Sequence, residues 1–326
     1  MIVLVTGATG FVGSQIAAAL VARGDTVRVL RREASRTIAL DGLPLEHVFG
    51  DILDREAVDR AVAGCDLVFH VAALSSYWRA QRAEIYRVNV DGTRTVMAAC
   101  LAARVPRVVH TSSVGAIGVP QNGRAADEDT VFDPRETRFA YGHSKHLAEE
   151  EVRAAVAQGL PAVIVNPAVV IGPGDHNLIS GSLIVELARR PLPAAPPGGV
   201  CMTDIDAVVA GHLAAAARGR VGERYILGGE NLTYREIITT INEIVGHTPP
   251  RWTLPSWILP PAAATLDLIN RFVRQPVAVG EQVRLVAHHA FYDSAKAVRE
   301  LDYPILPFRS AAERAYRWYL QHGYIR

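Results

Sequence analysis

The chain is 326 residues long, 49% hydrophobic and 21% charged, which is typical of a folded globular protein. Its length corresponds to about two domains, or to one large α/β domain with an appendage. Thirty-four basic and 33 acidic residues leave a net charge of +1. The chain therefore lacks the excess of positive charge that binds a phosphate backbone, and we expect no nucleic-acid partner.

Cysteine usage and apolar runs indicate where the protein works. The three cysteines, Cys65, Cys100 and Cys201, lie far apart and without paired spacing. This is typical of buried thiols in a reducing compartment, and not of disulfides or metal ligands. The apolar start of the chain has no basic leader, and no apolar run is long enough to span a bilayer. We therefore expect a cytoplasmic protein without an integral membrane segment.

In the first half of the chain, short β-branched runs alternate with longer helical patterns. Strands are predicted at 2–5, 26–30, 46–49, 67–70, 107–111 and 162–165. Helices are predicted between them at 11–23, 54–62, 83–104 and 141–158. The strands are nearly unbroken apolar runs, as expected when helices cover both faces of a parallel sheet. This order predicts an α/β fold, a Rossmann-type doubly wound parallel sheet.

The second half changes character after a predicted helix at about 178–190. Prolines and glycines interrupt the chain between 191 and 199, and a helix at 205–217 and a strand at 224–227 return to the sheet. Beyond Gly229 the pattern is helical with long proline-bearing connections. We therefore predict a large domain of residues 1–170 and about 201–228. A smaller, mostly helical C-terminal domain takes about 171–200 and 229–326.

A glycine-rich motif lies between the first strand and the first helix. Gly7 permits a tight turn, Gly10 lets the backbone approach a pyrophosphate, and Gly13 lets the helix pack closely on the strand. The helix N-terminus offers free N–H groups and the positive end of its dipole to the phosphates. The sequence therefore predicts a dinucleotide site that includes Gly7, Thr9, Gly10, Phe11, Val12 and Gly13.

The end of the second strand distinguishes one dinucleotide from another. An NAD site usually has an acidic residue there to bind the ribose 2′-hydroxyl, whereas this strand ends in Arg31 and Arg32. A guanidinium can bind a 2′-phosphate with two hydrogen bonds, which favours NADP(H) over NAD(H). The alternative is that the two arginines are only a solvated surface pair. The adenine and the floor beneath the cofactor are predicted to meet Asp51, Ile52, Val71, Ala72 and Ala73.

Tyr141 and Lys145 are predicted to lie on one face of a helix, because they are four residues apart. A lysine cation nearby lowers the pKa of a tyrosine and suits it to proton transfer near neutral pH. The fifth strand ends at Thr111, Ser112 and Ser113, at the carboxyl edge where doubly wound sheets build their sites. A hydroxyl there can hydrogen-bond a substrate carbonyl.

With these motifs the sequence resembles the extended short-chain dehydrogenases/reductases, also called the NAD-dependent epimerase/dehydratase family. The resemblance covers nearly the whole chain and rests on motifs at 6–13, 70–73, 88–93, 111–113, 141–145, 166–167, 172–175 and 223–229. Within the family it is most similar to the dihydroflavonol 4-reductase-like branch, which includes hopanoid-associated sugar epimerases. Residues 222–232 and the pair Tyr77 and Trp78 carry the likeness to the latter.

The resemblance implies roles for individual residues. Tyr141 would be the general acid/base, and Lys145 would be its pKa partner and bind the nicotinamide ribose. Ser113 would orient the substrate oxygen, with Ser112 as the weaker candidate, and Asn89 would support the site. The large domain would bind NADP and the smaller one the substrate. Further candidates are Pro167 for the cofactor and Tyr77, Trp78 and Asn166 for the substrate.

Departures from the family pattern narrow the chemistry. Sugar-nucleotide dehydratases carry an Asp-Glu pair just after the serine or threonine, whereas Val114 and Gly115 follow Ser113 here. Ile117 and Gly118 stand where many epimerases have Tyr-Gly, which resembles the reductase branch. Asn166 is compatible with a sugar-nucleotide phosphate contact, but equally with a turn before a proline. No metal site, serine-hydrolase elbow or Walker lysine is predicted.

The sequence therefore predicts an NADP(H)-dependent carbonyl reductase or alcohol dehydrogenase that acts on an apolar or aromatic small molecule. A sugar-nucleotide epimerase with a permanently bound cofactor is the first alternative. A non-catalytic NADP-binding sensor is the second, although such proteins typically lose the tyrosine or the lysine. The resemblance also implies a homodimer formed through the helices at 83–104 and 141–158.

Overall fold

A computed structural model describes residues 1–75, 81–119, 124–270 and 280–325. Its centre is a seven-stranded, all-parallel sheet with strand order β10-β6-β5-β4-β1-β2-β3. The strands are β1 (Ile2–Thr6), β2 (Thr26–Arg31), β3 (Leu45–Phe49), β4 (Leu67–His70), β5 (Val108–Thr111), β6 (Ala162–Pro167) and β10 (Arg224–Leu227). The strand order reverses at β1, which is the topology of a Rossmann-type doubly wound sheet. This confirms the predicted fold class.

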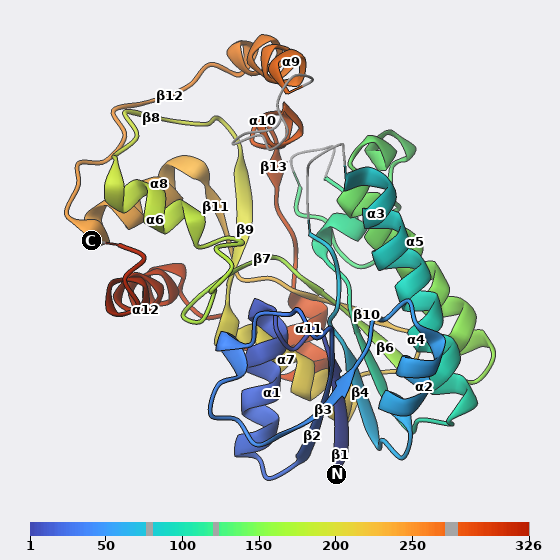
Figure 1. Ribbon diagram of the computed structural model, residues 1–326. Helices are drawn as coiled ribbons and strands as arrows, with labels where there is room; N and C mark the ends of the chain where they lie inside the picture. The colour runs from blue at the N-terminus through green and yellow to red at the C-terminus, as the bar shows by residue number, and fades with distance from the viewer. Residues whose placement is uncertain (76–80, 120–123, 271–279, 326) are drawn as a thin grey trace.

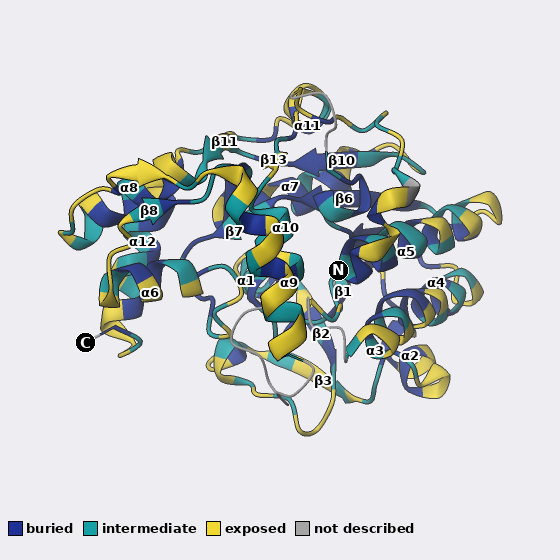
Figure 2. Cartoon of the chain, turned by 90° about the horizontal axis from the view of Figure 1, so that it is seen from above, coloured by how far each residue is buried: buried dark blue, intermediate teal, exposed yellow. Residues whose placement is uncertain are grey.

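Helices cover both faces of the sheet (Figure 1). One face is covered by α1 (Phe11–Ala22), α7 (Ile205–Arg218) and α11 (Ala295–Leu301). The other is covered by α2 (Arg55–Val62), α4 (Gly92–Ala102) and α5 (Ala140–Ala157). Seen from above, the buried strands lie between helices whose outer faces are exposed (Figure 2). Burial on both faces explains why the central strands are continuous apolar runs.

A second lobe lies above the carboxyl ends of the strands (Figure 1). Most of its regular structure is helical: α6 (Ser182–Arg189), α8 (Tyr234–Val245), α9 (Leu259–Ile269), α10 (Gly280–Leu285) and α12 (Phe308–Gln321). A four-stranded sheet runs through it, formed by β7 (Val169–Ile171), β9 (Gly199–Asp204), β11 (Glu230–Thr233) and β13 (His289–Ala290). A short pair, β8 (Ala194–Ala195) and β12 (Trp252–Thr253), lies beside α8. The lobe has a hydrophobic core of its own between α6, α8 and α12.

Several features differ from the sequence prediction, including the short strands β11, β12 and β13 in the part beyond Gly229 that was predicted to be helical. The single helix predicted at 83–104 is α3 (Arg82–Tyr86) followed by a π-helical turn at Arg87–Asp91 and then α4. The strand β9 was not predicted, because its segment follows several prolines and its partners β7, β11 and β13 are distant in sequence. The π-helical turn contains Asn89, and such turns are frequent at functional sites.

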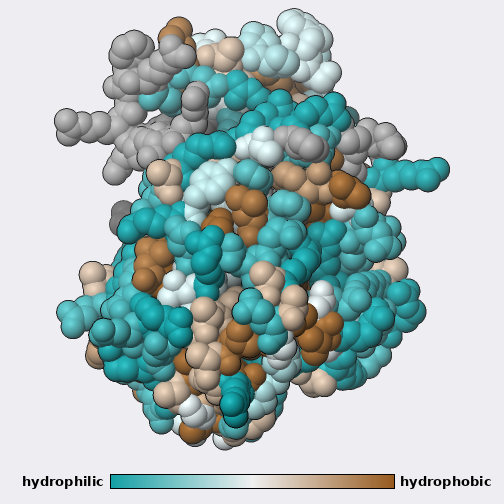
Figure 3. All heavy atoms as spheres, turned by 90° about the vertical axis from the view of Figure 1, so that its right-hand side faces the viewer, coloured by the Kyte–Doolittle hydropathy of each residue, from teal (hydrophilic) through white to brown (hydrophobic). Residues whose placement is uncertain are grey.

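The outer face of the layer that contains α2, α4 and α5 is mainly hydrophilic, with hydrophobic residues in separate patches (Figure 3). An ion pair between Arg94 of α4 and Glu151 of α5, with 2.8 Å between Nη2 and Oε1, joins the two helices on this face. None of the helices within the described residues is long and apolar enough to cross a membrane.

Candidate active site

A cavity of about 1220 Å³ opens between the carboxyl ends of β1, β4, β5 and β6 and the second lobe. This is the crevice at the reversal of strand order where doubly wound sheets bind their ligands. Its wall brings together predicted residues from seven separate segments of the chain: Gly7, Thr9, Gly10, Phe11, Val12, Gly13, Arg31, Arg32, Asp51, Ile52, Val71, Ala72, Ala73, Ser113, Tyr141, Lys145 and Pro167.

The glycine loop is packed too tightly for any larger residue. Gly7 has φ +74°, and a Cβ there would lie 2.6 Å from the backbone nitrogen of Ala72. A Cβ at Gly13 would lie 2.3 Å from the carbonyl oxygen of Gly7. The helix α1 begins at Phe11 with no side-chain cap, so its first N–H groups remain available at the cavity. The loop therefore fits a pyrophosphate bound on backbone N–H groups.

Arg31 and Arg32 lie at one end of the cavity and differ in their surroundings. The Nε atom of Arg31 donates to Nδ1 of His47 at 3.1 Å, and its guanidinium lies 4.5 Å from the ring centroid of Phe49. Arg32 has a 72% exposed side chain, and its ion pair with Asp51 is long at 4.0 Å. Arg31 is therefore held against the sheet edge, whereas the guanidinium of Arg32 can turn toward an anion.

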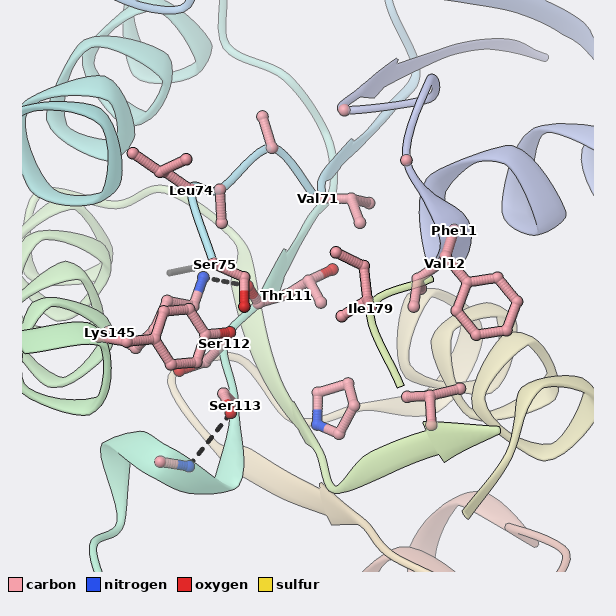
Figure 4. A pocket seen from close by; sticks show the side chains of 18 of the residues that line it. Phe11, Val12, Val71, Leu74, Ser75, Thr111, Ser112, Ser113, Lys145 and Ile179 are labelled. Atoms are coloured by element: carbon pink, nitrogen blue, oxygen red, sulfur yellow. Dashed lines mark hydrogen bonds between the residues drawn. The ribbon is translucent and has the colours of Figure 1, made fainter. Parts of the chain in front are cut away.

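Ser113 and Lys145 lie together at one end of the pocket, and Phe11 and Val12 lie at the other (Figure 4). Tyr141 and Lys145 come from the first turns of α5, and Ser113 follows β5. The Nζ atom of Lys145 donates to the carbonyl oxygen of Thr111 at 2.6 Å, which fixes the ammonium beneath the end of β5. Leu74 and Ser75 lie on the same side of the pocket as Lys145 and were not foreseen from the sequence.

The pKa of Tyr141 differs in direction from the sequence prediction. Burial raises the pKa of Tyr141 above its ordinary value, while hydrogen bonds with Ser113 and Ser75 partly oppose the rise. Lys145 is not among the groups that shift the pKa of Tyr141. Burial lowers the pKa of Lys145 itself to about 8, and Glu149 partly opposes this. The expectation that the lysine lowers the tyrosine pKa is therefore wrong for this arrangement. Tyr141 is a protonated phenol at neutral pH.

Glu149 is a buried carboxylate one helical turn beyond Lys145 that the sequence analysis overlooked. It accepts hydrogen bonds from Ser112 Oγ and from Asn166 Nδ2, both at 2.6 Å. It also pairs with Arg153 at 2.7 Å and with Arg224 at 3.4 Å. Its spacing from Lys145 on α5 was a usable signal, but its partners come from β5, β6 and β10 and could not be paired from the sequence.

The two predicted asparagines lie behind the cavity wall. Asn89, in the π-helical turn, donates to the carbonyl oxygen of Leu74 at 3.1 Å and accepts from its backbone N–H at 2.7 Å. It also donates to Ser144 Oγ at 2.9 Å. Asn166 is fully buried and donates to the carbonyl oxygen of Ser113 at 2.9 Å. Both asparagines therefore fix the backbone that forms the site, and neither forms part of the cavity wall as described.

The predicted substrate residues Tyr77 and Trp78 lie outside the described residues. The wall away from the glycine loop is instead largely apolar, and sequence reasoning missed it because its members sit on loops and on both lobes: Leu74, Val114, Val119, Phe139, Val169, Val170, Leu178, Ile179, Val200, Tyr234, Leu285, Ala290 and Tyr292. The charged residues of the described wall are Arg31, Arg32, Asp51, Glu84, Glu136 and Lys145. No group of three or more metal-ligating side chains occurs in the part of the chain that the structure describes.

Comparison with known proteins agrees with this geometry. A protein from Synechocystis sp. named as a dihydroflavonol 4-reductase is 39% identical over 99% of this chain and 95% of its own length. The sterol demethylase protein B of Methylococcus capsulatus is 36% identical over the full length of both chains. The solved structure of a nucleoside-diphosphate-sugar epimerase from Pseudomonas aeruginosa superposes with a TM-score of 0.83 at 27% identity, covering 100% of this chain and 99% of the other.

Residues 3–228, which include the glycine loop, the end of β5 and the start of α5, match the NAD dependent epimerase/dehydratase family. Fold, site and sequence thus lead to one assignment. The chain belongs to this family, within the extended short-chain dehydrogenases/reductases, and is an NAD(P)-dependent oxidoreductase.

Proposed function

We propose that the protein is an NADP(H)-dependent carbonyl reductase or alcohol dehydrogenase that acts on an apolar small molecule. The observation that carries the proposal is the position of Tyr141 and Ser113 between the glycine loop and an apolar wall of the same cavity. The hydroxyl of Ser113 binds the substrate oxygen and holds it near the phenol of Tyr141. The raised pKa of Tyr141 keeps the phenol protonated, so that it can donate its proton to that oxygen during reduction.

The residues of the glycine loop fit the cofactor pyrophosphate, and Lys145 and Pro167 lie where they can hold the nicotinamide end. When bound, the nicotinamide supplies or accepts the hydride. Asn89 and Asn166 act as positioning residues, because each fixes a backbone carbonyl of the wall. Lys145, anchored on Thr111, supplies a positive charge beneath the phenol and the substrate oxygen.

The preference for NADP(H) rests on Arg32. Its side chain is exposed at the cavity rim and is held only by a long ion pair, so a 2′-phosphate can replace Asp51 as its partner. Asp51 itself lies in the same wall and accepts from the backbone N–H of Leu53 at 3.0 Å. NAD(H) remains the alternative cofactor, with Asp51 as the acidic group near the ribose.

The charges of the cavity favour a reductase over a sugar-nucleotide epimerase. A sugar nucleotide carries a diphosphate, which proteins bind with arginine, lysine or helix N-termini. Within the described wall the cations are Arg31 and Arg32 at the cofactor end and Lys145 beneath Tyr141. Lys145 is occupied with the reacting groups, so the described wall offers no further cation for a diphosphate of the substrate. The non-catalytic sensor is disfavoured because Ser113, Tyr141 and Lys145 are all present at the site.

The test begins with the nucleotide released from freshly purified, denatured protein, and with the affinities of the nucleotide-free protein for NADPH and NADH. We expect a protein without stoichiometric nucleotide that prefers NADPH and oxidises it with members of a panel of apolar ketones and aldehydes. Replacing Tyr141 with Phe should abolish turnover and leave NADPH affinity unchanged. A stoichiometric yield of NAD, together with turnover of UDP-sugars, would establish the epimerase instead.

We also propose the division into an NADP-binding domain, residues 1–170 and about 201–228, and a substrate-binding domain, about 171–200 and 229–326. A cytoplasmic homodimer formed through α4 and α5 is the corresponding proposal for assembly. Light scattering of the purified protein tests the dimer. Glu151 lies on that face, and reversing its charge should disrupt the dimer if the interface is formed there.

A further inference from the structure

One carboxylate in the apolar part of the cavity is not used by the proposed mechanism. Glu136 is only 6% exposed, yet it forms part of the cavity wall. Within the described residues its carboxylate has no hydrogen-bond donor and no ion-pair partner. Its oxygens are not among the fully enclosed polar atoms, so they remain accessible to a molecule that enters from outside the protein. A carboxylate in a largely buried residue is costly unless it is hydrogen-bonded.

The turn that carries Glu136 is held firmly. It is the 3₁₀ turn Pro134–Arg138, which the side chain of Asp133 caps by accepting from the backbone N–H of Arg135 at 2.8 Å. From α3, the guanidinium of Arg82 donates to the carbonyl oxygens of Thr137 at 3.0 Å and Arg138 at 3.2 Å. The fold therefore places this carboxylate in the wall and does not leave it on a free loop.

The charged groups around Glu136 do not satisfy it. Burial raises the pKa of Glu136, while the nearest cation, Arg138, lowers it. Arg138 is exposed and its guanidinium lies 4.9 Å from the ring centroid of Phe139. Arg135 is committed to Asp133, at 2.6 Å between Nη2 and Oδ2. Among the described residues no side chain pairs with Glu136, so its partner comes from outside the protein, either water or a ligand in the cavity that replaces the water.

Glu136 lies within reach of a substrate whose carbonyl is on Ser113. Its side chain borders Gly118, where an added Cβ would lie 3.5 Å from Cγ of Glu136. Ser113 and Gly118 are joined by the 3₁₀ turn Val114–Ala116, and at about 2 Å per residue they lie on the order of 10 Å apart. Tyr292 closes the same wall by donating to the carbonyl oxygen of Gly118 at 2.8 Å.

We propose that Glu136 is a specificity-determining residue that binds a hydroxyl group of the substrate, remote from the carbonyl that is reduced. This inference rests on the proposed reductase function and adds a substrate class to it, apolar hydroxyketones. A hydroxyl satisfies the site in either state, because it donates to a carboxylate and accepts from a carboxylic acid. An ammonium group has three donors, and among the described residues those beside Glu136 in the wall are mainly apolar.

The test uses three matched probes: 4-(4-hydroxycyclohexyl)cyclohexanone, its deoxy analogue 4-cyclohexylcyclohexanone, and the corresponding amine. Dissociation constants are measured with the Tyr141→Phe protein loaded with NADP⁺, so that binding is read without turnover. The hydroxyketone should bind about tenfold more tightly than the deoxy ketone, as expected for one hydrogen bond to a charged or buried group. When Glu136→Leu is added, the ratio of the two dissociation constants should fall to about one, because only the binding of the hydroxyketone is weakened. Glu136→Gln should keep part of the preference.

The matched control is Glu84→Leu, because Glu84 belongs to the same wall but is already paired with Arg87 at 2.8 Å. It should leave the ratio unchanged. Equal binding of the hydroxyketone and the deoxy ketone, equal weakening of both by Glu136→Leu, or tighter binding of the amine would each overturn the proposal. Turnover by the wild-type protein is read separately with NADPH. Discrimination in binding without NADPH oxidation would refute the reductase and leave the subsite standing.

Discussion

Lys145 is buried beneath the proposed catalytic residues, Ser113 and Tyr141. Its burial lowers the stability of the folded protein, and replacing it with methionine should reveal this cost. The side chain is 2% exposed, and burial lowers its pKa from the ordinary 10.5 to about 8. At about 1.4 kcal/mol per pH unit, this difference costs roughly 3 kcal/mol at neutral pH. The hydrogen bond that it donates to Thr111 returns about 1.5–3 kcal/mol. Lys145→Met should therefore be as stable as the wild type near pH 7, or more stable by about 1 kcal/mol.

The pH dependence makes the prediction specific. Between about pH 8 and 10.5 the unfolded chain keeps the lysine proton that the folded protein has lost, so the free energy of unfolding of the wild type rises with pH in this window. The two histidines near Lys145 stay neutral in this window. Burial, and then the charge of Lys145, hold the pKa of His70 near 3 and that of His110 well below its ordinary value, and burial raises that of Tyr141. Glu149 is the carboxylate facing Lys145 on α5.

The assay is denaturant unfolding of both proteins across this pH range, with Lys296→Met as the matched control. Lys296 is the other lysine of the chain and pairs with Glu223 at 2.6 Å, so its loss should lower stability at neutral pH. The free energy of unfolding of Lys145→Met, taken relative to that of the wild type, should fall by about 3 kcal/mol between about pH 8 and 10.5. A constant difference across the range, or a loss of more than about 3 kcal/mol at neutral pH, would refute the reasoning. Reductase activity should be lost in Lys145→Met.

Three further substitutions test other parts of the site. Arg32→Ala should weaken NADPH binding about tenfold in a fluorescence titration and leave NADH binding unchanged. The expected loss is modest because the side chain is exposed. Equal weakening of NADPH and NADH binding would contradict a role in 2′-phosphate recognition. Glu149→Gln should lower the free energy of unfolding by about 3 kcal/mol, because it breaks a buried ion pair, and should lower the pKa of Lys145 further. The control Glu150→Gln, on the same helix, should change the free energy of unfolding by less than about 0.5 kcal/mol. Gly13→Ala should weaken binding of both cofactors roughly tenfold, because the new methyl group meets a backbone carbonyl of the glycine loop; unchanged titrations would show that the loop can yield.

The sequence by itself determined the features that depend on local spacing. The parallel strands are continuous apolar runs, the glycine loop follows the first of them, and Tyr141 and Lys145 share a helix face at four-residue spacing. Each of these follows from the period of a helix or from burial on both faces of a sheet. Because the carboxyl ends of parallel strands meet at one edge, the meeting of Ser113 with this helix was also predictable.

Tertiary structure alone decided the features that depend on distant partners. The strand β9 forms because it pairs with β7, β11 and β13, which begin at Val169, Glu230 and His289 and are distant from it in sequence. Glu149 and Glu136 gain their significance from contacts, or from the lack of them, that no local pattern encodes. The same holds for the pKa of Tyr141, whose direction depends on burial more than on its spacing from a lysine. Local periodicity fixes which side chains share a face, and only packing fixes what surrounds them.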